Sequence, residues 1–343
     1  MSSSHVVILF GGASSERLVS VASAQNVSSL LPEAACWFLT SSGSVHVVDR
    51  AALAAHQKPF EVDFAPGGPP TFPSLDAALE GPQAKAQVFF LALHGGAGEN
   101  GTVQAVFEAR RLPFTGSSAA ASARAFDKAI TKALVGAKGA RLAEAEVFVH
   151  ERPSDIQARL LALFKTAPRW VLKPVEDGSS VGLIHLTSPD QTSEAASQMS
   201  RSGLRYLAEQ FIEGRELTVG VVDEPGGPVA LPVSEVRTVP GGAFDYAGKY
   251  LGRGTEELTP APITDAERAQ AQQLGLLAHT TVGCRGYSRT DMILTPQGPV
   301  FLEINTLPGL TKASFIPQQL AAAGKDLKAF LVQQLELARR RYD

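Results

Sequence analysis

The sequence predicts an α/β protein built around a parallel sheet, and two repeated patterns predict it. Short apolar runs at 6–10 and 88–93 both end in glycine pairs, at 11–12 and 95–96. Such runs are typical of buried strands that break into tight turns, and a helical stretch follows the first turn from about Ser14. Ligand-binding groups of parallel sheets gather where the strands end, so we expect a site beside these glycines.

The composition is that of an ordinary globular protein. The 343 residues carry a formal charge of −3, with 44% hydrophobic and 19% charged side chains, and this length predicts two or three domains. The slightly acidic balance excludes the broad basic surface of a general nucleic-acid binder. No signal-peptide pattern opens the chain and no apolar run approaches a membrane span, so we expect a cytoplasmic protein. Two cysteines, Cys36 and Cys284, are too few for a disulfide framework and are expected to be buried.

A second group of elements follows in the middle of the chain. Alanine-rich residues 118–145 predict helix, and the apolar runs at 170–174 and 206–212 predict strands. The strand at 170–174 leads into a loop rich in glycine and serine at 176–182. Such loops offer backbone N–H groups and hydroxyls to anions, although loops of this composition are also common without that role.

The last third contains a helix and a hairpin. Thr264 followed by Glu267 forms a capping box, which predicts a helix through about Thr281. Two strands at 286–295 and 299–304 flank the loop Pro-Gln-Gly. A three-residue loop with glycine last is typical of a hairpin with a bulge at the turn.

The register of this hairpin places chemically important residues together. It sets Asp291 opposite Glu303 and Arg289 opposite Asn305, and directly opposed residues share one face. The other face is expected to be apolar and to pack on a core, with Met292, Leu294, Val300 and Leu302.

Two facing carboxylates repel each other unless a cation lies between them. Asp291 and Glu303 with the amide of Asn305 form an oxygen-rich ligand set that suits Mg²⁺. The alternative is a surface hairpin whose charges are solvated, and the spacing alone leaves both interpretations open.

A bound Mg²⁺ would make a nucleotide the natural partner. The sequence has no Walker A motif and no G-x-G-x-x-G fingerprint, so neither a P-loop nor a nicotinamide enzyme is supported. What remains is Lys173, at the end of a predicted strand, running into the glycine-serine loop.

Taken together, eight strings of this sequence resemble the D-alanine–D-alanine ligases of the ATP-grasp superfamily. They occur in the family's order, with similar spacing, between residue 6 and about residue 320. The strings are FGGASSERLVS at 10–20, HGGAGENGT at 94–102, DK at 127–128, KPVEDGSSVG at 173–182, EQFIEGRE at 209–216, FDYAGKY at 244–250, RTD at 289–291 and EINTLPGLT at 303–311.

The resemblance implies an ATP-grasp fold with an N-terminal Rossmann-like domain at 1–119 and two ATP-grasp subdomains at 120–212 and 213–343. It implies a cytoplasmic enzyme of peptidoglycan precursor synthesis, which forms D-alanyl-D-alanine through a D-alanyl phosphate. The implied ligands are ATP, D-alanine and two Mg²⁺ ions, with Mn²⁺ as a substitute. The family also implies a homodimer, with no membrane or nucleic-acid partner.

The resemblance also implies roles for individual residues. The residues that match nucleotide-binding positions are Lys128, Lys173 and Ser180 for the phosphates, Glu209 and Ile212 for adenine, and Glu216 for the ribose. The metal ligands match Asp291, Glu303 and Asn305, in agreement with the hairpin register. The substrate positions are Glu16 for the first D-alanine ammonium, Ser179 and Tyr250 as its partners, His94, the oxyanion groups Arg289 and Gly309, and Lys249, Ser314 and Phe315 for the second D-alanine.

Each of these residues also has a plain structural interpretation. Glu16 is a first-turn helix carboxylate, and a lone histidine such as His94 is more often structural than catalytic. The chain departs from the usual family pattern at Asn100, at Gln210 and in the Tyr-Ala-Gly-Lys-Tyr string at 246–250. These departures lie at the rim of the expected sites, and the glycine-rich loops at 176–182 and 240–254 are expected to act as lids.

Two alternatives remain beside the main prediction. One is a ligase that makes D-alanyl-D-lactate or D-alanyl-D-serine, although the pair Lys249-Tyr250 disfavours lactate by resemblance. The other is a nucleotide-binding protein of the same fold without catalysis, which is disfavoured because every matched catalytic position is retained.

Overall fold

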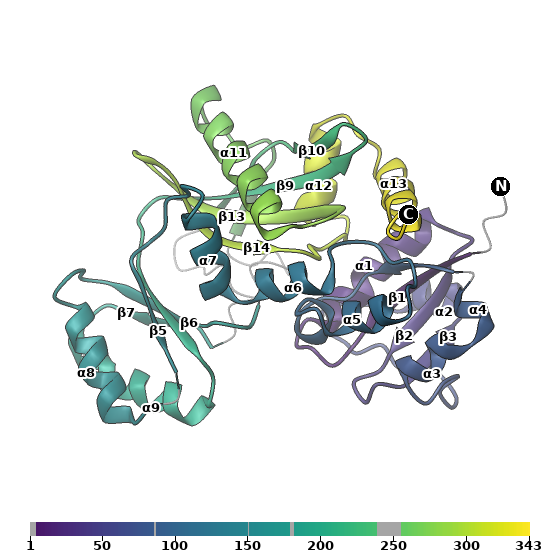
Figure 1. Ribbon diagram of the computed structural model, residues 1–343, viewed down its shortest axis with the longest axis horizontal. Helices are drawn as coiled ribbons and strands as arrows, with labels where there is room; N and C mark the ends of the chain where they lie inside the picture. The colour runs from purple at the N-terminus through teal and green to yellow at the C-terminus, as the bar shows by residue number, and fades with distance from the viewer. Residues whose placement is uncertain (1–4, 86, 150, 179–181, 239–254) are drawn as a thin grey trace.

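The computed structural model describes residues 5–85, 87–149, 151–178, 182–238 and 255–343. These residues form three sheets, which follow one another along the chain. Figure 1 shows the middle sheet with its helices set apart from the other two, with α6 (Ala119–Phe126) and α7 (Lys128–Gly136) between the parts.

The first sheet confirms the predicted parallel pairing. Its strand order is β3-β2-β1-β4, and β1 (Val6–Gly11) pairs in parallel with β2 (Ala35–Leu39) and β4 (Val88–Leu91). The edge strand β3 (Val45–Val48) runs antiparallel to β2. Alternate side chains of these strands enter two separate cores, so both faces are buried. The helices of this part are α1 (Arg17–Leu30), α2 (Arg50–Ala55), α3 (Leu75–Glu80), α4 (Pro82–Lys85) and α5 (Thr102–Ala109), with a 3₁₀ turn η1 (Gly96–Gly98).

The middle sheet is antiparallel and has a core of its own. Its strands, in order, are β5 (Ala145–Phe148), β8 (Tyr206–Gln210), β6 (Trp170–Pro174) and β7 (Ile184–Leu186). The helices α8 (Pro153–Leu163) and α9 (Thr192–Ser202), preceded by η2 (Pro189–Gln191), bury apolar side chains against one face, around Trp170 and Tyr206. Lys173 and Glu209 therefore project from the opposite face.

The third sheet carries the three predicted metal ligands together with Arg289 and Glu216. Its order is β12-β11-β9-β13-β14, from β12 (Thr255–Leu258), β11 (Ser234–Thr238), β9 (Arg215–Glu224), β13 (Tyr287–Thr295) and β14 (Gly298–Asn305), and β10 (Gly227–Ala230) also pairs with β9. Helix α11 (Asp265–Val282) covers its apolar face. The predicted capping box is confirmed, with reciprocal bonds between Thr264 and Glu267.

The first and third sheets share one hydrophobic core. A single cluster joins Ile8 and Phe10 of β1 to Tyr287 of β13 and to the helices α12 (Phe315–Ala322) and α13 (Leu327–Arg339). The end of the chain adds a polar anchor, because Arg341 donates from Nε to the carbonyl of Phe114 at 3.1 Å and from Nη2 to Gly116. Its guanidinium also lies 3.7 Å from the centre of the Phe114 ring.

The hairpin has the predicted register at its polar end but a different turn. Asp291 pairs with Glu303 and Arg289 with Asn305, as predicted. The turn is shorter than expected because Gly298 already pairs with Thr295, and the extra residue is accommodated as a bulge beside Met292. The prediction that Val300 and Leu302 share the apolar face was therefore wrong. The side chains on that face are Met292, Leu294, Phe301 and Ile304.

Two helix predictions also need correction. The segment 118–145 is not one helix, because Asp127 has extended dihedral angles, ends α6 and caps α7 by accepting a hydrogen bond from the Ile130 N–H. Helix α1 begins at Arg17 and not near Ser14, because the Ser14 hydroxyl is used in a turn that binds the carbonyl of His94 at 2.5 Å. Both corrections involve short polar side chains that bond to backbone and so compete with helix.

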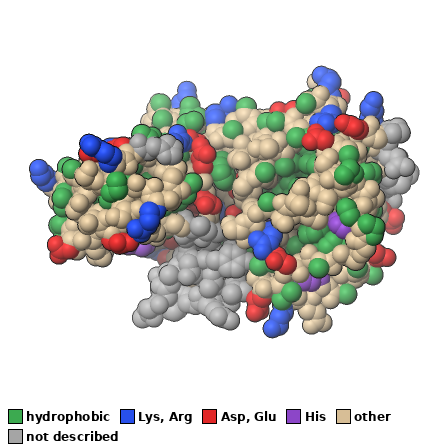
Figure 2. Space-filling view, turned by 90° about the horizontal axis from the view of Figure 1, so that it is seen from below, with side chains coloured by type: hydrophobic (Ala, Val, Ile, Leu, Met, Phe, Trp, Pro, Cys, Tyr) green, Lys and Arg blue, Asp and Glu red, His purple; other side chains and the backbone are tan. Residues whose placement is uncertain are grey.

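Among the described residues, no helix is long and apolar enough to cross a membrane. Figure 2 shows acidic and basic side chains interspersed on the face that it presents, with no broad basic area.

The two cysteines give a direct test of the fold. Cys36 is buried, as expected, whereas Cys284 is half-buried. Desolvation raises the pKa of Cys36 to about 11 and that of Cys284 to about 12. Because the thiolate is the reactive form, we expect neither thiol of the native protein to react with Ellman's reagent at pH 8 within minutes. In guanidinium chloride both thiols should react. Rapid reaction of either thiol in the native protein would contradict this packing.

Candidate active site

The polar face of the hairpin holds the predicted metal ligands. Arg289 donates to both carboxylate oxygens of Asp291, from Nε to Oδ1 at 2.9 Å and from Nη2 to Oδ2 at 2.7 Å. The hydroxyl of Thr218, on the neighbouring strand β9, donates to Asp291 Oδ1 at 2.6 Å. Asp291 is buried, whereas the side chain of Glu303 is 33% exposed toward the cleft.

The donor set fits a hard divalent cation. Within the described residues, no three Asp, Glu, His or Cys side chains cluster as metal ligands. The predicted set has two carboxylates, Asp291 and Glu303, and the amide of Asn305, which pair across β13 and β14. The amide oxygen of Asn305 accepts a hydrogen bond from the Leu307 N–H at 2.8 Å, which fixes the orientation of that side chain. Carboxylate and amide oxygens with room for water are typical of Mg²⁺ sites.

Lys128, which is predicted to bind phosphate, lies at the start of α7 and points toward the hairpin face that carries Glu303. Its Nζ donates to the carbonyl of Asp177 at 2.5 Å and lies 3.8 Å from Glu303 Oε2. Burial lowers the pKa of Lys128 below its usual value, and the nearby Glu303 carboxylate opposes that shift. Lys128 therefore links the glycine-serine loop to the predicted metal ligands.

The second predicted lysine, Lys173, lies on β6 and forms an ion pair with Glu209 of β8. A further lysine, Lys132, approaches the same carboxylate from α7, with 2.5 Å between Nζ and Glu209 Oε1. Burial alone would raise the pKa of Glu209, but Lys173 and Lys132 together hold that pKa below its usual value. The ribose candidate Glu216 lies on β9, on the face that carries Thr218 and Asp291.

Glu16 and His94, both predicted for the first substrate, lie beyond the carboxyl ends of β1 and β4. Glu16 directly precedes α1, makes no side-chain capping bond to that helix and is 8% exposed. A Cβ added to Gly95 or to Gly178 would come within 2.7 Å or 2.8 Å of its Oε2, so glycine at both positions leaves room for this carboxylate. Glu16 therefore lies between the loop after β4 and the glycine-serine loop.

His94 is buried in a polar network behind Glu16. Its Nε2 lies 2.9 Å from the hydroxyl of Ser23, which also accepts the Leu310 N–H at 3.2 Å. Its Nδ1 lies 3.8 Å from Glu99 Oε1. Through Ser23 the histidine supports the loop that carries Gly309, next to Leu310.

A cleft on the third sheet contains Ser314 and Phe315, and we name it the second-substrate cleft after the role predicted for these residues. The cleft is bounded by Arg289, Asp291, Gly309, Ser314 and Phe315, with Glu216 and Thr218 on its floor. A Cβ on Gly309 would lie 2.6 Å from the Ser314 hydroxyl, so this close approach requires glycine. An adjoining cleft contains Glu16, Lys128, Asp177, Arg289, Glu303 and Asn305.

Arg289 lines both clefts and therefore marks where they meet. Of the remaining predicted residues, Ser179, Ser180, Lys249 and Tyr250 lie outside the described residues, as do most of the expected lids. Ile212 follows β8 by two residues, at the edge of the middle sheet.

Sequence reasoning missed three contributors to this site. Phe60, from the first domain, lines the second-substrate cleft, on a segment that is held by a two-point ion pair between Arg17 and Asp63. No sequence signal pointed to Phe60.

Lys132 lies four residues after Lys128 and therefore on the same face of the helix, which was an available signal. Gln319, on α12, bonds to the β9 backbone.

Two family models match the chain. The model described as D-ala D-ala ligase N-terminus matches residues 5–117, and the model described as D-ala D-ala ligase C-terminus matches residues 145–336. The chain belongs to the D-alanine–D-alanine ligase family. The family predicted from the eight sequence strings is confirmed.

Individual relatives agree with the family models. A D-alanine--D-alanine ligase from Leptospira interrogans serogroup Icterohaemorrhagiae serovar Lai is 38% identical over 262 residues, which cover 75% of this chain and 74% of that relative. The solved D-alanine-D-alanine ligase from Coxiella burnetii has a TM-score of 0.78 and 25% identity, covering 98% of this chain and 95% of that one. The VanG D-Ala:D-Ser ligase from Enterococcus faecalis shares the fold, with a TM-score of 0.79, 24% identity and coverage of 98% and 100%. The predicted ATP-grasp architecture of this D-alanine–D-alanine ligase family member is confirmed.

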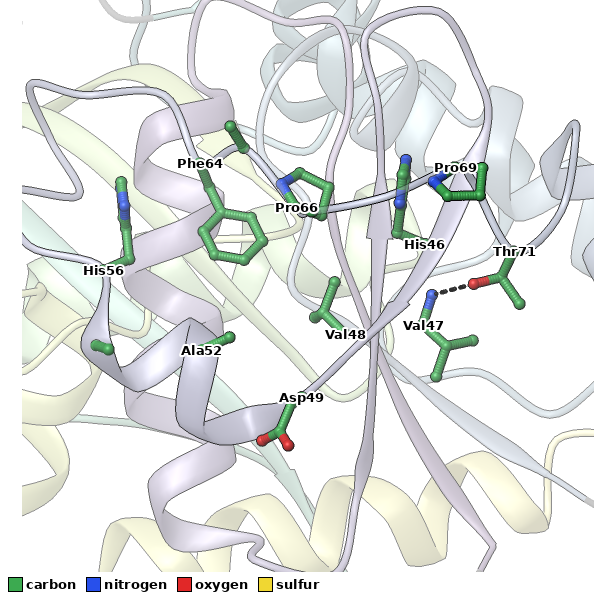
Figure 3. A pocket seen from close by; sticks show the side chains of 13 residues that line it. His46, Val47, Val48, Asp49, Ala52, His56, Phe64, Pro66, Pro69 and Thr71 are labelled. Atoms are coloured by element: carbon green, nitrogen blue, oxygen red, sulfur yellow. Dashed lines mark hydrogen bonds between the residues drawn. The ribbon is translucent and has the colours of Figure 1, made fainter.

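A separate pocket lies away from these clefts. Figure 3 shows it between β3, α2 and the proline-rich segment at 64–71, with His46, His56 and Phe64 on its walls. It contains none of the predicted site residues.

Gln319 connects α12 to β9 of the third sheet by hydrogen bonds. Its fully buried amide accepts the Gly220 N–H at 2.8 Å and donates to the Thr218 carbonyl and the Ser234 hydroxyl, each at 3.0 Å. We expect Gln319→Leu to lower the free energy of unfolding by at least about 2 kcal/mol, because buried backbone groups lose their partners.

The measurement is urea unfolding followed by circular dichroism. Gln297→Leu is the matched control, because that side chain is exposed in the hairpin turn. Equal stability of the two variants would contradict the anchoring role of Gln319.

Proposed function

We propose that this chain joins two D-alanines to D-alanyl-D-alanine at the expense of ATP, as a step of peptidoglycan precursor synthesis in the cytoplasm. The observation that supports it most is the convergence of two clefts at Arg289. One cleft contains Lys128, Glu303 and Glu16, and the other contains Gly309 and Ser314. The carboxylate of the first D-alanine has to meet the γ-phosphate of ATP and then, as an acyl phosphate, the amine of the second D-alanine, and a junction of two clefts allows both encounters.

We assign the domains as 1–119 for the first D-alanine, 120–212 for adenine and phosphate, and 213–343 for the metal and the second D-alanine. In this assignment Lys128, Lys173 and Ser180 bind phosphate oxygens. Glu209 and Ile212 bind adenine and Glu216 binds the ribose. We further propose a homodimer, from family membership.

Asp291, Glu303 and Asn305 would hold Mg²⁺, as two ions, with Mn²⁺ as a substitute. Bound metal would neutralise charge on the β- and γ-phosphates and orient them for transfer. Arg289 now holds both oxygens of Asp291, and this contact keeps the carboxylate in position.

The proposed chemistry activates a carboxylate. The carboxylate of the first D-alanine attacks the γ-phosphorus of ATP, which gives an acyl phosphate and ADP. The amine of the second D-alanine then attacks the acyl carbon, the resulting oxyanion collapses, phosphate leaves and the amine loses a proton.

The chain contributes position and charge to both steps. Glu16 holds the ammonium of the first D-alanine, with Ser179 and Tyr250 as partners and His94 nearby. Arg289 and the Gly309 N–H stabilise the oxyanion, and Lys249, Ser314 and Phe315 hold the second D-alanine. Loops at 176–182 and 240–254 exclude water, because an acyl phosphate is hydrolysed easily.

The main experiment measures ADP release from ATP, Mg²⁺ and D-alanine, with L-alanine, D-serine and D-lactate in parallel reactions. We expect turnover with D-alanine alone and formation of the dipeptide. Products from D-serine or D-lactate would favour a mixed ligase. ATP binding without turnover on any substrate would favour a non-catalytic binding protein.

The metal ligands are tested by Glu303→Ala. Loss of one of two carboxylates weakens Mg²⁺ binding, so we expect ADP release to fall at least a hundredfold. Glu194→Ala is the control, because that glutamate is exposed on α9, remote from the clefts. Full activity of Glu303→Ala would exclude this metal assignment.

A further inference from the structure

Lys132 is a buried lysine that has no role in the proposed chemistry. Its side chain is only 6% exposed. Its Nζ lies 2.5 Å from Glu209 Oε1 and donates to the carbonyl of Phe301, on β14, at 3.1 Å. The same ammonium lies 5.5 Å from the centre of the Phe301 ring. Burying an ammonium group costs free energy of desolvation, so a buried lysine without an assigned role calls for an explanation.

The contacts of Lys132 complete a clamp on one carboxylate. Glu209 is 4% exposed, with Lys132 on Oε1 and Lys173 on Oε2. Glu303 on β14 also acts on the charge of Lys132, and Lys128 on α7 interacts electrostatically with Glu209 and Lys173. Burial lowers the pKa of Lys132 to about 8, so it still carries a charge at neutral pH. Glu209 is therefore held ionised although it is buried.

The protonation state of Glu209 decides what it can recognise. An ionised carboxylate only accepts hydrogen bonds, whereas a protonated carboxyl group or an amide also donates. An exocyclic amino group, as in adenine, satisfies an acceptor. A carbonyl oxygen at the same place, as in hypoxanthine, does not.

We propose that Lys132 is a positioning residue that acts through Glu209 to make the nucleotide site select a base with an amino group over one with a carbonyl oxygen. This inference rests on the proposed function, which places Glu209 at the adenine site.

Lys132 suits this task better than Lys173. Lys173 is assigned to the phosphates, so its charge is shared once the nucleotide is bound. Lys132 is anchored to the backbone of β14, and its charge remains with Glu209. The same anchor joins the adenine strand β8 to the strand that carries Glu303 and Asn305.

The test compares ATP with inosine triphosphate, which has a carbonyl oxygen in place of the amino group. In Lys132→Met we expect the ratio of kcat/KM for the two nucleotides to fall at least tenfold. The loss should lie in KM for ATP, with kcat changed less than threefold. Lys138→Met is the control, because Lys138 is exposed at the end of the same helix.

A double variant separates this role from simple packing. Glu209→Gln should collapse the ratio, and adding Lys132→Met should reduce it no further, because both changes act through one carboxylate. If Lys132→Met does not fold because the Glu209 carboxylate is left without one of its two cations, the double variant avoids that problem, since it contains no carboxylate at position 209. The comparison of Glu209→Gln with the double variant then still tests the proposal. An additional loss in the double variant, or an unchanged ratio in Lys132→Met, would overturn the proposal.

The pH profile gives a second readout. The ratio should be constant between pH 6 and 7.5 in the wild type. In Lys132→Met it should fall as the pH is lowered, because loss of one cation raises the pKa of Glu209 and the carboxyl group takes up a proton. A pH-independent ratio in that variant would contradict the proposal.

Nucleotide binding measured without turnover separates the proposed ligase activity from the proposed role of Lys132 in base selection. Calorimetric titration with ATP and with inosine triphosphate reports base selection whether or not D-alanine is consumed. Selective ATP binding in a wild type that does not turn over D-alanine would contradict the proposed function and leave the role of Lys132 standing. Equal binding of both nucleotides by the wild type would overturn that role.

Discussion

One extra residue in β14 determines which side chains face the cleft that contains Lys128, Glu303 and Asn305. Since side chains alternate along a strand, the bulge beside Met292 reverses the alternation between the turn and the polar end of the hairpin. Phe301 can therefore pack on α11 while Glu303 and Asn305 face Asp291 and Arg289. Without the bulge, Glu303 would point into the apolar core, and the two clefts would not meet on a charged surface.

The sequence predicts the local parts of this arrangement well. The strands at 6–10 and 170–174, the Thr264–Glu267 box and the polar register of the hairpin depend on neighbours along the chain. The position of the bulge is not predictable in this way, because a bulge at the turn and a bulge within β14 give the same pairing of Asp291 with Glu303. Only the packing of Phe301 on the third sheet distinguishes them.

Contacts between distant segments account for the rest. Phe60 lines the cleft of Ser314 and Phe315 although it lies far from them in the sequence, and its segment also carries the exposed Arg17–Asp63 ion pair. Gln319 can be recognised as an anchor only when α12 is seen against β9. Lys132 and Glu209 are 77 positions apart in the sequence, and no local pattern links a helix lysine to a particular strand carboxylate. The roles of these residues follow from their burial and their hydrogen bonds in the folded protein.

The hydrophobic core shared by the first and third sheets has a mechanical consequence. One apolar cluster and the Arg341 anchor join these sheets into a single block, while the middle sheet is built around separate apolar side chains. The middle sheet is inserted into that block and is connected to it by the chain on either side, before β5 and after β8 (Figure 1). The buried Lys132–Glu209 ion pair crosses this boundary, because it joins β8 of the middle sheet to α7, which packs against β14. The placement of the middle sheet therefore depends in part on charge, whereas the other two sheets are held together by apolar packing.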